Sequence, residues 1–229
     1  MGAAEALVFD FNGTLSDDEP LLLSIYQELF ARFGRPLPEE EYVDRLAGNT
    51  EEAIIGTWLG VDGPLLAMLV QERIAAYTAL AASGSTVTAH VREAVRYASV
   101  RVPVAIVSGA FRAEIEPVVA AAGIAGDLST IVTADDVEHG KPHPDLYLEA
   151  AARLGIPPET ALSIEDSPAG TQAALAAGMH VVVVPDLVAP PDDIAPRLAA
   201  VFPSLDALRE AVKPVWTPTP AAQRARSHG

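Results

Sequence analysis

The residues best suited to chemistry in this sequence begin with Asp10, which ends a short apolar segment. The nonapeptide LVFDFNGTL, residues 7–15, starts with the apolar run typical of a buried strand. A carboxylate at the end of a central strand, with Gly13 letting backbone amides approach a ligand, suits attack on a phosphoryl group. Asn12-Gly13 between apolar residues is also a strong hairpin signal. A hairpin needs a second apolar strand, which TLSDDEP does not supply, but this stretch alone leaves both interpretations open.

Two further groups of polar residues stand where other apolar segments end. Ser108-Gly109 follows the second segment, and Glu165-Asp166-Ser167 closes the fourth. In an open parallel sheet, ligands bind beyond the carboxyl ends of the strands. Serine and aspartate are also ordinary helix caps and turn formers, so each group alone has a structural explanation. Their coincidence with Asp10 around one crevice favours an active site.

Lys141 lies between these groups, in a Gly-Lys-Pro turn that precedes an expected helix. An ammonium held there could neutralise both a carboxylate nucleophile and a phosphoryl oxygen, although a solvated loop lysine is the simpler interpretation of the turn by itself. His139 and His143 flank the lysine. Since no second ligand stands at zinc spacing, we interpret both histidines as loop residues.

Alternating helices and apolar strands should position these groups. We expect helices at 89–98, 111–122, 144–154 and 168–177, with a last helix ending near Val212. Strict alternation of this kind predicts a parallel sheet with helices on both faces. The expected strands are 6–9, 102–107, 130–133, 161–165 and 180–184, with a weaker one at 198–202.

Residues 16–84 differ from the rest, because they contain helical patterns and no strand pattern. The apolar residues of the first expected helix recur at helical spacing, and Gly34 stops it. A second helix starts after Pro38, residues 49–52 open a third, and a fourth runs from Pro64 to about Ala82. The segment is expected to be a compact helical insertion. The apolar residues of its first helix are Leu22, Ile25, Tyr26, Leu29 and Phe33.

Composition limits the kinds of protein that this chain could be. Its 229 residues, half of them hydrophobic, suffice for a sizeable core and for two domains. The net charge of −16 argues against nucleic acid or an anionic membrane as a partner. Without cysteine there is no disulfide, thiolate metal site or thiol nucleophile. No run has the length of a transmembrane helix and no signal-peptide pattern is present, so we expect a cytoplasmic protein.

Four motifs in order resemble those of the haloacid dehalogenase-like (HAD) superfamily, and within it the β-phosphoglucomutase-like phosphatases with a helical cap. The resemblance spans residues 1–184. It implies a Rossmann-like α/β core at 1–15 and 85–212, a mobile cap at 16–84, and Mg²⁺-dependent phosphoryl transfer through an aspartyl-phosphate. Residues 213–229, rich in Pro, Thr, Ala and Arg, are expected to be a disordered tail. The motifs are DFNGT at 10–14, SGA at 108–110, GKPHPD at 140–145 and SIEDSPAGTQAALAAGM at 163–179.

The resemblance implies a magnesium site and a nucleophile. Asp10 is similar to the family's nucleophile, which is also a metal ligand. Asp166 resembles the second carboxylate ligand, with Glu165 acting through water. The position of Asn12 contributes its backbone carbonyl to the metal in this family. Oxygen ligands of this kind suit a hard cation such as Mg²⁺.

The resemblance also implies residues that bind the substrate. Thr14 is expected to order the motif loop, and Ser108, beside Gly109, to donate a hydrogen bond to a phosphoryl oxygen. Lys141 takes the charge-neutralising role. In the cap, the candidate contacts are Arg45, Asn49, Thr50 and Trp58, of which Trp58 is better explained as a core residue.

Two positions depart from the family pattern. Asn12 replaces the aspartate that serves the family's phosphatases as general acid and base, and an amide cannot transfer a proton at neutral pH. Glu51 stands where a mutase has arginine, and a glutamate would repel a second phosphate. A sugar-phosphate mutase is therefore disfavoured.

These observations favour a Mg²⁺-dependent hydrolase of a small phosphorylated metabolite, present as a monomer or homodimer. A catalytically silent member that binds a phosphorylated ligand or a partner protein is the first alternative. A metal-independent, dehalogenase-like hydrolase is the second, but it would not need the Glu165-Asp166 pair. The phosphonatase reaction uses a cap lysine, and residues 16–84 contain none.

Overall fold

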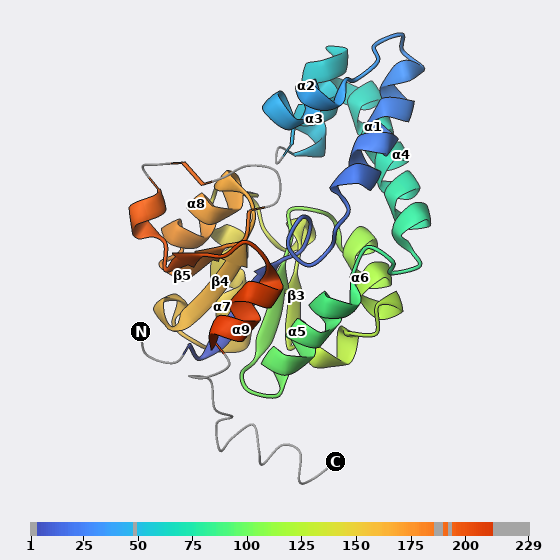
Figure 1. Ribbon diagram of the computed structural model, residues 1–229. Coiled ribbons are helices and arrows are strands. Elements are labelled where there is room, and N and C mark those ends of the chain that lie inside the picture. The colour runs from blue at the N-terminus through green and yellow to red at the C-terminus, as the bar shows by residue number, and fades with distance from the viewer. Residues whose placement is uncertain (1–3, 48–49, 186–189, 192–193, 213–229) are drawn as a thin grey trace.

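The core of the protein is a six-stranded parallel sheet with β1 near its centre (Figure 1). The computed structural model describes residues 4–47, 50–185, 190–191 and 194–212. The strand order is β3-β2-β1-β4-β5-β6, and every pair of neighbours is parallel. The expected α/β parallel sheet is thereby confirmed. Its strands are β1 (Ala6–Asp10), β2 (Val104–Val107), β3 (Thr130–Val132), β4 (Ala161–Glu165), β5 (His180–Val183) and β6 (Ala200–Val201).

The strand register brings the polar residues to one edge. Asp10 of β1 lies opposite Val107 of β2, so that Ser108 follows β2 next to the end of β1. On the other side of β1, Phe9 lies opposite Ile164 of β4, and Glu165 is therefore the next residue at this edge. Parallel pairing thus aligns the carboxyl ends of β1, β2 and β4, as the strand ends of an open sheet require for a ligand site.

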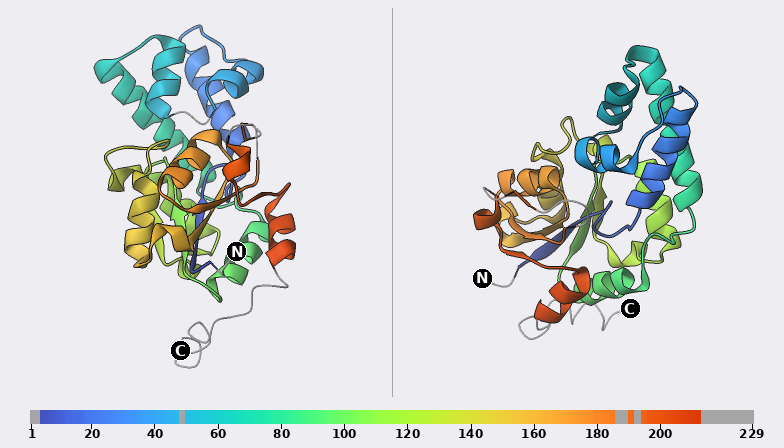
Figure 2. Two further views of the ribbon diagram at one scale, coloured as in Figure 1. Left: turned by 90° about the vertical axis from the view of Figure 1, so that its left-hand side faces the viewer. Right: turned by 45° about the horizontal axis from the view of Figure 1, so that its top comes forward.

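Helices cover both faces of the sheet (Figure 2). Leu7 and Phe9 of β1 point into one apolar cluster, and Val8, between them, points into the other. This alternation follows from the two-residue period of a strand, and burial of both faces explains why β1 is apolar from Ala6 to Phe9. The helices of this domain are α5 (Ala89–Ser99), α6 (Arg112–Ala121), α7 (Asp145–Leu154), α8 (Pro168–Ala176) and α9 (Leu205–Val212).

Within the part of the cap that the structure describes, four helices lie beyond the carboxyl ends of the strands (Figures 1 and 2). Helix α4 packs against α1 and α3 and also reaches α6 of the sheet domain. Thr50 caps α3, since its hydroxyl accepts the Ala53 amide at 3.3 Å. The fold class with an inserted helical cap is confirmed, while the boundaries at 15/16 and 84/85 stay predictions. The cap helices are α1 (Glu19–Ala31), α2 (Glu39–Arg45), α3 (Glu51–Leu59) and α4 (Gly63–Ala81).

The end of α1 differs from the expectation. The helix stops at Ala31, and Phe33, expected on its buried face, is 43% exposed. Phe30, inside the helix, is buried instead. Beyond Ala31 the chain turns back, with the Arg35 amide donating to the Phe30 carbonyl. Trp58 stacks near Phe30 with ring centroids 6.4 Å apart, as its interpretation as a core residue predicts.

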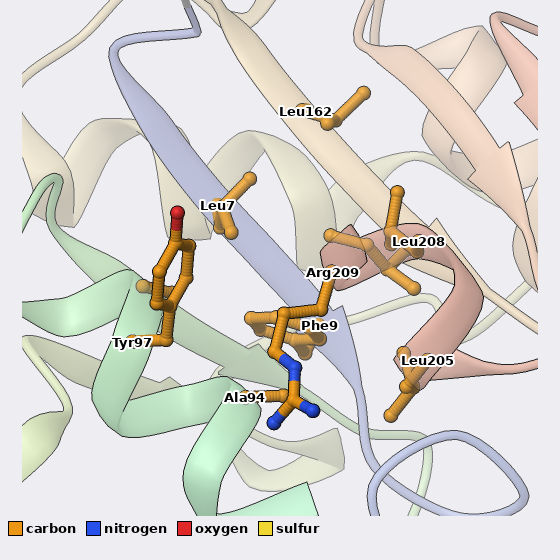
Figure 3. Close-up of a pocket in the computed structure, with 10 residues that line it drawn as sticks. Leu7, Phe9, Ala94, Tyr97, Leu162, Leu205, Leu208 and Arg209 are labelled. Carbon is orange, nitrogen blue, oxygen red and sulfur yellow. The ribbon is translucent and has the colours of Figure 1, made fainter. Parts of the chain in front are cut away.

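Helix α9 covers part of one sheet face and leaves a small apolar hollow beneath it (Figure 3). Leu7 and Phe9 form its floor, with Leu205 and Leu208 of α9 beside them. Its volume of about 30 Å³ leaves room for only about two water molecules. The hollow is a packing feature under a terminal helix, and the polar residues singled out above lie at a different place.

No helix in the described ranges combines the length and the apolar character needed to cross a membrane. The predicted tail at 213–229 and the candidate contact Asn49 lie outside the described residues.

Candidate active site

Three carboxylates meet at the carboxyl edge of the sheet. Asp10 is the last residue of β1, Glu165 is the last of β4, and Asp166 follows it. One oxygen from each lies within 4.8 Å of the others. Asp10 and Glu165 are buried. This proximity follows directly from the pairing of β1 with β4 and forms an oxygen-rich cluster able to hold a metal ion.

Lys141 places one positive charge among these carboxylates. Its ammonium donates to Asp10 Oδ1 and, at 2.6 Å, to Glu165 Oε1. Tyr147 of α7 donates its hydroxyl to the same Glu165 oxygen, and the ammonium lies 5.6 Å from the Tyr147 ring centroid. The lysine is therefore held against Asp10 and Glu165 and is not a solvated loop residue.

The electrostatics of the cluster show a surplus of negative charge. Burial raises the pKa of Asp10 to about 7, although the Lys141 ammonium opposes the rise. Burial, followed by the carboxylates of Asp10 and Glu165, raises the pKa of Asp166. Burial lowers the pKa of Lys141, but these carboxylates outweigh it and hold that pKa well above its usual range. One ammonium against three carboxylates leaves a site that a bound cation would stabilise.

Asn12 is held on both sides of its amide group. Its Nδ2 donates to Asp18 Oδ2 at 2.8 Å, and its Oδ1 accepts the Ser108 hydroxyl at 3.1 Å. Asp18, which precedes α1, is fully buried and also accepts a hydrogen bond from the Tyr77 hydroxyl of α4. The amide therefore links the loop after β1 to the end of β2 and to the start of the cap. An aspartate at this position would face the Asp18 carboxylate directly.

Thr14 and Ser108 make contacts within the site. The Thr14 hydroxyl lies 3.3 Å from Asp166 Oδ1, so it connects the motif loop to the carboxylate cluster. Ser108 is fully buried, and its oxygen accepts the Ala110 amide at 3.0 Å while its hydrogen is directed at Asn12. The expected hydrogen bond from Ser108 to a phosphoryl oxygen stays a prediction.

A cavity of about 140 Å³ separates the carboxylate cluster from the cap. It has room for roughly ten water molecules at about 10–15 Å³ each, which suits a small substrate. Thr50 lines it, whereas Arg45 and Trp58 are not among its described lining residues and lie against each other. The sheet domain contributes Asp10, Asn12, Gly109, Ala110, Gly140, Lys141, Asp166 and Ser167, and the cap contributes Glu19, Leu22, Tyr26, Tyr42, Thr50, Glu51, Ile54 and Arg73.

Comparison with known proteins identifies the family. The family model described as haloacid dehalogenase-like hydrolase matches residues 7–184, which include the carboxylate cluster, Lys141 and the cap. The chain belongs to the haloacid dehalogenase-like hydrolase family. The expected hydrolase class is thereby confirmed.

Several relatives in this family carry phosphatase names. The putative phosphatase YhcW of Bacillus subtilis is 32% identical over 189 residues, which cover 80% of this chain and 84% of that protein. Hexitol phosphatase B of Escherichia coli is 28% identical over 209 residues, covering 90% and 93%. A crystal structure of CbbY from Rhodobacter sphaeroides with xylulose-(1,5)bisphosphate has a TM-score of 0.75 at 27% identity, covering 88% and 95%. These names support the narrower class of phosphoric monoester hydrolase.

The HAD-like motifs did not reveal every residue of the site. Arg73 of α4 lines the cavity, although it is 3% exposed, and it contacts Glu114 of α6. Its spacing offers a signal, since Leu69, Val70 and Tyr77 share its buried helix face. A charged residue on an otherwise apolar helix face requires a buried partner. Asp18, which accepts a hydrogen bond from the Asn12 amide, also lies outside the four motifs.

Proposed function

We propose that the protein is a Mg²⁺-dependent phosphatase that hydrolyses a small phosphorylated metabolite through an aspartyl-phosphate on Asp10. The observation that carries this proposal is the cluster of Asp10, Glu165 and Asp166 around Lys141. Asp10, Asp166 and Lys141 line the cavity. The phosphatase names of relatives that cover most of the chain support it.

The residues present fit a magnesium ion. The cluster offers carboxylate oxygens alone, the ligand type that a hard cation prefers, and its charge exceeds that of Lys141. Asp10, Asp166 and the Asn12 backbone carbonyl would hold the ion, with Glu165 acting through water. When bound, Mg²⁺ supplies positive charge to the nucleophile and to the phosphoryl oxygens.

The reaction takes place in two displacements at phosphorus. In the first, an Asp10 carboxylate oxygen attacks the phosphorus, and the bond to the ester oxygen breaks as the alkoxide leaves and takes a proton from water. In the second, water attacks the phosphorus of the aspartyl-phosphate, releasing inorganic phosphate and the free Asp10 carboxylate. Lys141 holds Asp10 in place and offsets the charge that gathers on the phosphoryl oxygens.

Proton transfer is the unusual part of this mechanism. The leaving alkoxide needs a proton, and the attacking water must lose one. Asn12 lines the cavity and can orient either group by hydrogen bonding, but its amide cannot exchange a proton at neutral pH. We therefore assign Asn12 a positioning role and expect good leaving groups to react best.

The cap provides the rest of the environment. Tyr26, Tyr42 and Thr50 line the cavity from the cap. Exclusion of bulk water there strengthens the interaction of Lys141 with a phosphoryl group. The predicted cytoplasmic location, the absence of nucleic-acid and membrane partners, and the monomeric or dimeric state stay predictions.

Phosphate release from a panel of phosphate esters, with and without EDTA, tests this function. We expect turnover that EDTA abolishes and that excess Mg²⁺ restores. Absence of turnover together with ligand-stabilised melting would instead favour a silent binding protein. Halide release from haloacids that EDTA does not affect would favour the dehalogenase-like alternative.

A further inference from the structure

A buried charged triad stands at the cap end of the cavity, made of Glu51, Arg73 and Glu114. One guanidinium nitrogen of Arg73 donates to Glu114 Oε1 and lies 3.4 Å from Glu51 Oε1. The side chains of Arg73 and Glu51 are 3% and 13% exposed, and that of Glu114 is fully buried. Glu51 and Arg73 line the cavity, and Glu114 lies behind them on α6.

The triad is fixed in place by its surroundings. The second carboxylate oxygen of Glu114 accepts the Phe111 amide at 3.1 Å, which anchors the group at the start of α6. The Arg73 guanidinium carbon lies 5.8 Å from the ring centroid of Tyr26 and 5.3 Å from that of Tyr77. These contacts hold the guanidinium toward α6, where its charge serves an internal ion pair.

The charge at this end of the cavity is consequently not positive. Among the described residues that line the cavity, Arg73 is the one basic side chain from the cap, whereas Glu19 and Glu51 are acidic. Burial raises the pKa values of Glu51 and Glu114, the latter to about 7, with Arg73 opposing both shifts. A buried guanidinium retains at least one charged partner. The charge of Arg73 is therefore offset by two carboxylates inside the protein, so this end of the cavity has no surplus positive charge for a second anionic group.

We propose that this triad makes the cavity selective for monophosphates whose far end is neutral and hydroxylated, and unfavourable for a second phosphate or a carboxylate. The inference rests on the proposed phosphatase function. Carboxylate oxygens of Glu19 and Glu51 can accept hydrogen bonds from hydroxyl groups, but they repel a second anion. The selectivity thus runs against the bisphosphate found with CbbY.

Two substrate pairs that differ only at the far end test the selectivity. They are glycerol 3-phosphate against 3-phosphoglycerate, and fructose 6-phosphate against fructose 1,6-bisphosphate. We expect kcat/KM to favour the first member of each pair by about tenfold or more. The comparison is made at pH 8, where the Glu114 carboxylate, with a pKa of about 7, is mostly ionised.

Variants connect the selectivity to the triad. Glu51→Gln and Glu114→Gln each remove one carboxylate that offsets the charge of Arg73. Each should therefore lower the ratio of kcat/KM values within a substrate pair several-fold, and the double variant should lower it further. Glu52→Gln on α3 and Glu116→Gln on α6 are matched controls, since both side chains are exposed. Glu114 is fully buried, so the Glu114→Gln protein could fail to fold. Glu51 lines the cavity, and the Glu51→Gln variant then tests the role of the triad by itself.

Binding to the Asp10→Asn variant separates this inference from the proposed function. Calorimetry with the same pairs reports selectivity without turnover. Absence of ester hydrolysis with retained binding selectivity would remove the phosphatase function and leave the role of the triad intact. Turnover that favours 3-phosphoglycerate or the bisphosphate, or ratios that Glu51→Gln changes no more than Glu52→Gln, would overturn the role of the triad.

Discussion

At the scale of single residues, we expect Asn12 to decide which phosphate esters the site can hydrolyse. Its amide lies between the Asp18 carboxylate and the Ser108 hydroxyl, so its orientation is fixed by partners that are complementary to an amide. A positioned general acid and base contributes about 10²–10⁴ in rate. We therefore expect p-nitrophenyl and acyl phosphates to react much faster than alkyl phosphates.

Replacing Asn12 alone by aspartate should recover only part of the rate that a general acid and base contributes. Asn12→Asp places a carboxylate 2.8 Å from the Asp18 oxygen, and this repulsion should lower the melting temperature. The double variant Asn12→Asp with Asp18→Asn restores an amide–carboxylate pair with the partners exchanged. We expect it to raise alkyl phosphate hydrolysis by a factor approaching 10²–10⁴. Kinetics and thermal melting of both variants check this prediction.

The control for this pair is Asp17→Asn, because Asp17 is exposed beside Asp18. Peptide mass spectrometry must accompany the assays, since Asn12-Gly13 is a sequence prone to deamidation and would produce aspartate. An Asn12→Asp variant as stable and as active as the double variant would contradict the coupling of Asn12 to Asp18.

Magnesium binding is a second prediction at this scale. Asp166→Asn should weaken Mg²⁺ binding sharply, because it removes a carboxylate of the cluster. Asn12→Ala should weaken it far less, since only the backbone carbonyl is assigned to the metal. Isothermal titration of the three proteins measures the effect. Equal losses in both variants, or no binding to the unmodified chain, would refute the assignment.

The sequence identified the site residues of the sheet domain better than those that involve the cap. Asp10 and Glu165 end strands, and the strand register alone brings them together. Asp18 and Tyr77 stand 59 positions apart, and Arg73 and Glu114 stand 41 apart on helices of different domains. Such pairs depend on how helices pack, which a periodic apolar pattern does not specify.

At the scale of elements, we expect the contact between α4 and α6 to make the stability of the fold depend on pH. Burial raises the pKa of Glu114 to about 7 from an ordinary 4.5, against the opposing effect of Arg73. A carboxyl with a higher pKa in the folded state stabilises the fold when protonated. That contribution is complete below about pH 4.5 and is lost as the pH rises through about 7.

The melting temperature should therefore decline from about pH 5 to pH 8, and Glu114→Gln should flatten part of this decline. An uncharged amide of similar shape has no proton to lose. Glu116→Gln, on the same helix but 55% exposed, should follow the unmodified protein. A decline of the same slope in all three proteins would show that Glu114 does not carry it.

The elements themselves were predicted well where amphipathic or apolar runs are bounded by clear signals. Helix α3 begins after its Thr50 cap, and α4 begins beside Pro64, as expected from the sequence. The end of α1 was predicted less well, because Phe33 continues the apolar spacing while the chain already turns toward Gly34. Local spacing cannot distinguish a last helical turn from the residues that follow it.

At the scale of the whole molecule, cap movement is the main expectation. The two connections between cap and core lie together, since the Asp17 amide donates to the Thr86 carbonyl and the Ser16 hydroxyl lies 2.8 Å from that of Thr86. Ser16 and Asp18 are also fully buried, which the polar sequence of this segment did not reveal. We propose that the cap moves about these paired connections.

Hydrogen exchange tests that movement. Amides at 83–85 should exchange faster than those of β1 and β2, and a bound phosphate analogue such as vanadate should slow them, because closure orders the connection. Residues 16–19 should be intermediate, since hydrogen bonds tie them to Thr86. Protection at 83–85 equal to that of β1, with or without vanadate, would exclude a hinge there.

Trapping of the phosphorylated enzyme tests the central claim most directly. The protein is mixed with acetyl phosphate and Mg²⁺, quenched in acid, and its peptides are analysed by mass spectrometry. We expect one phosphoryl group on Asp10, long-lived because Asn12 cannot deprotonate the attacking water, and absent in EDTA or in Asp10→Asn. Release of phosphate with no phosphoryl group on Asp10, or with the group on another residue, would contradict the proposed mechanism.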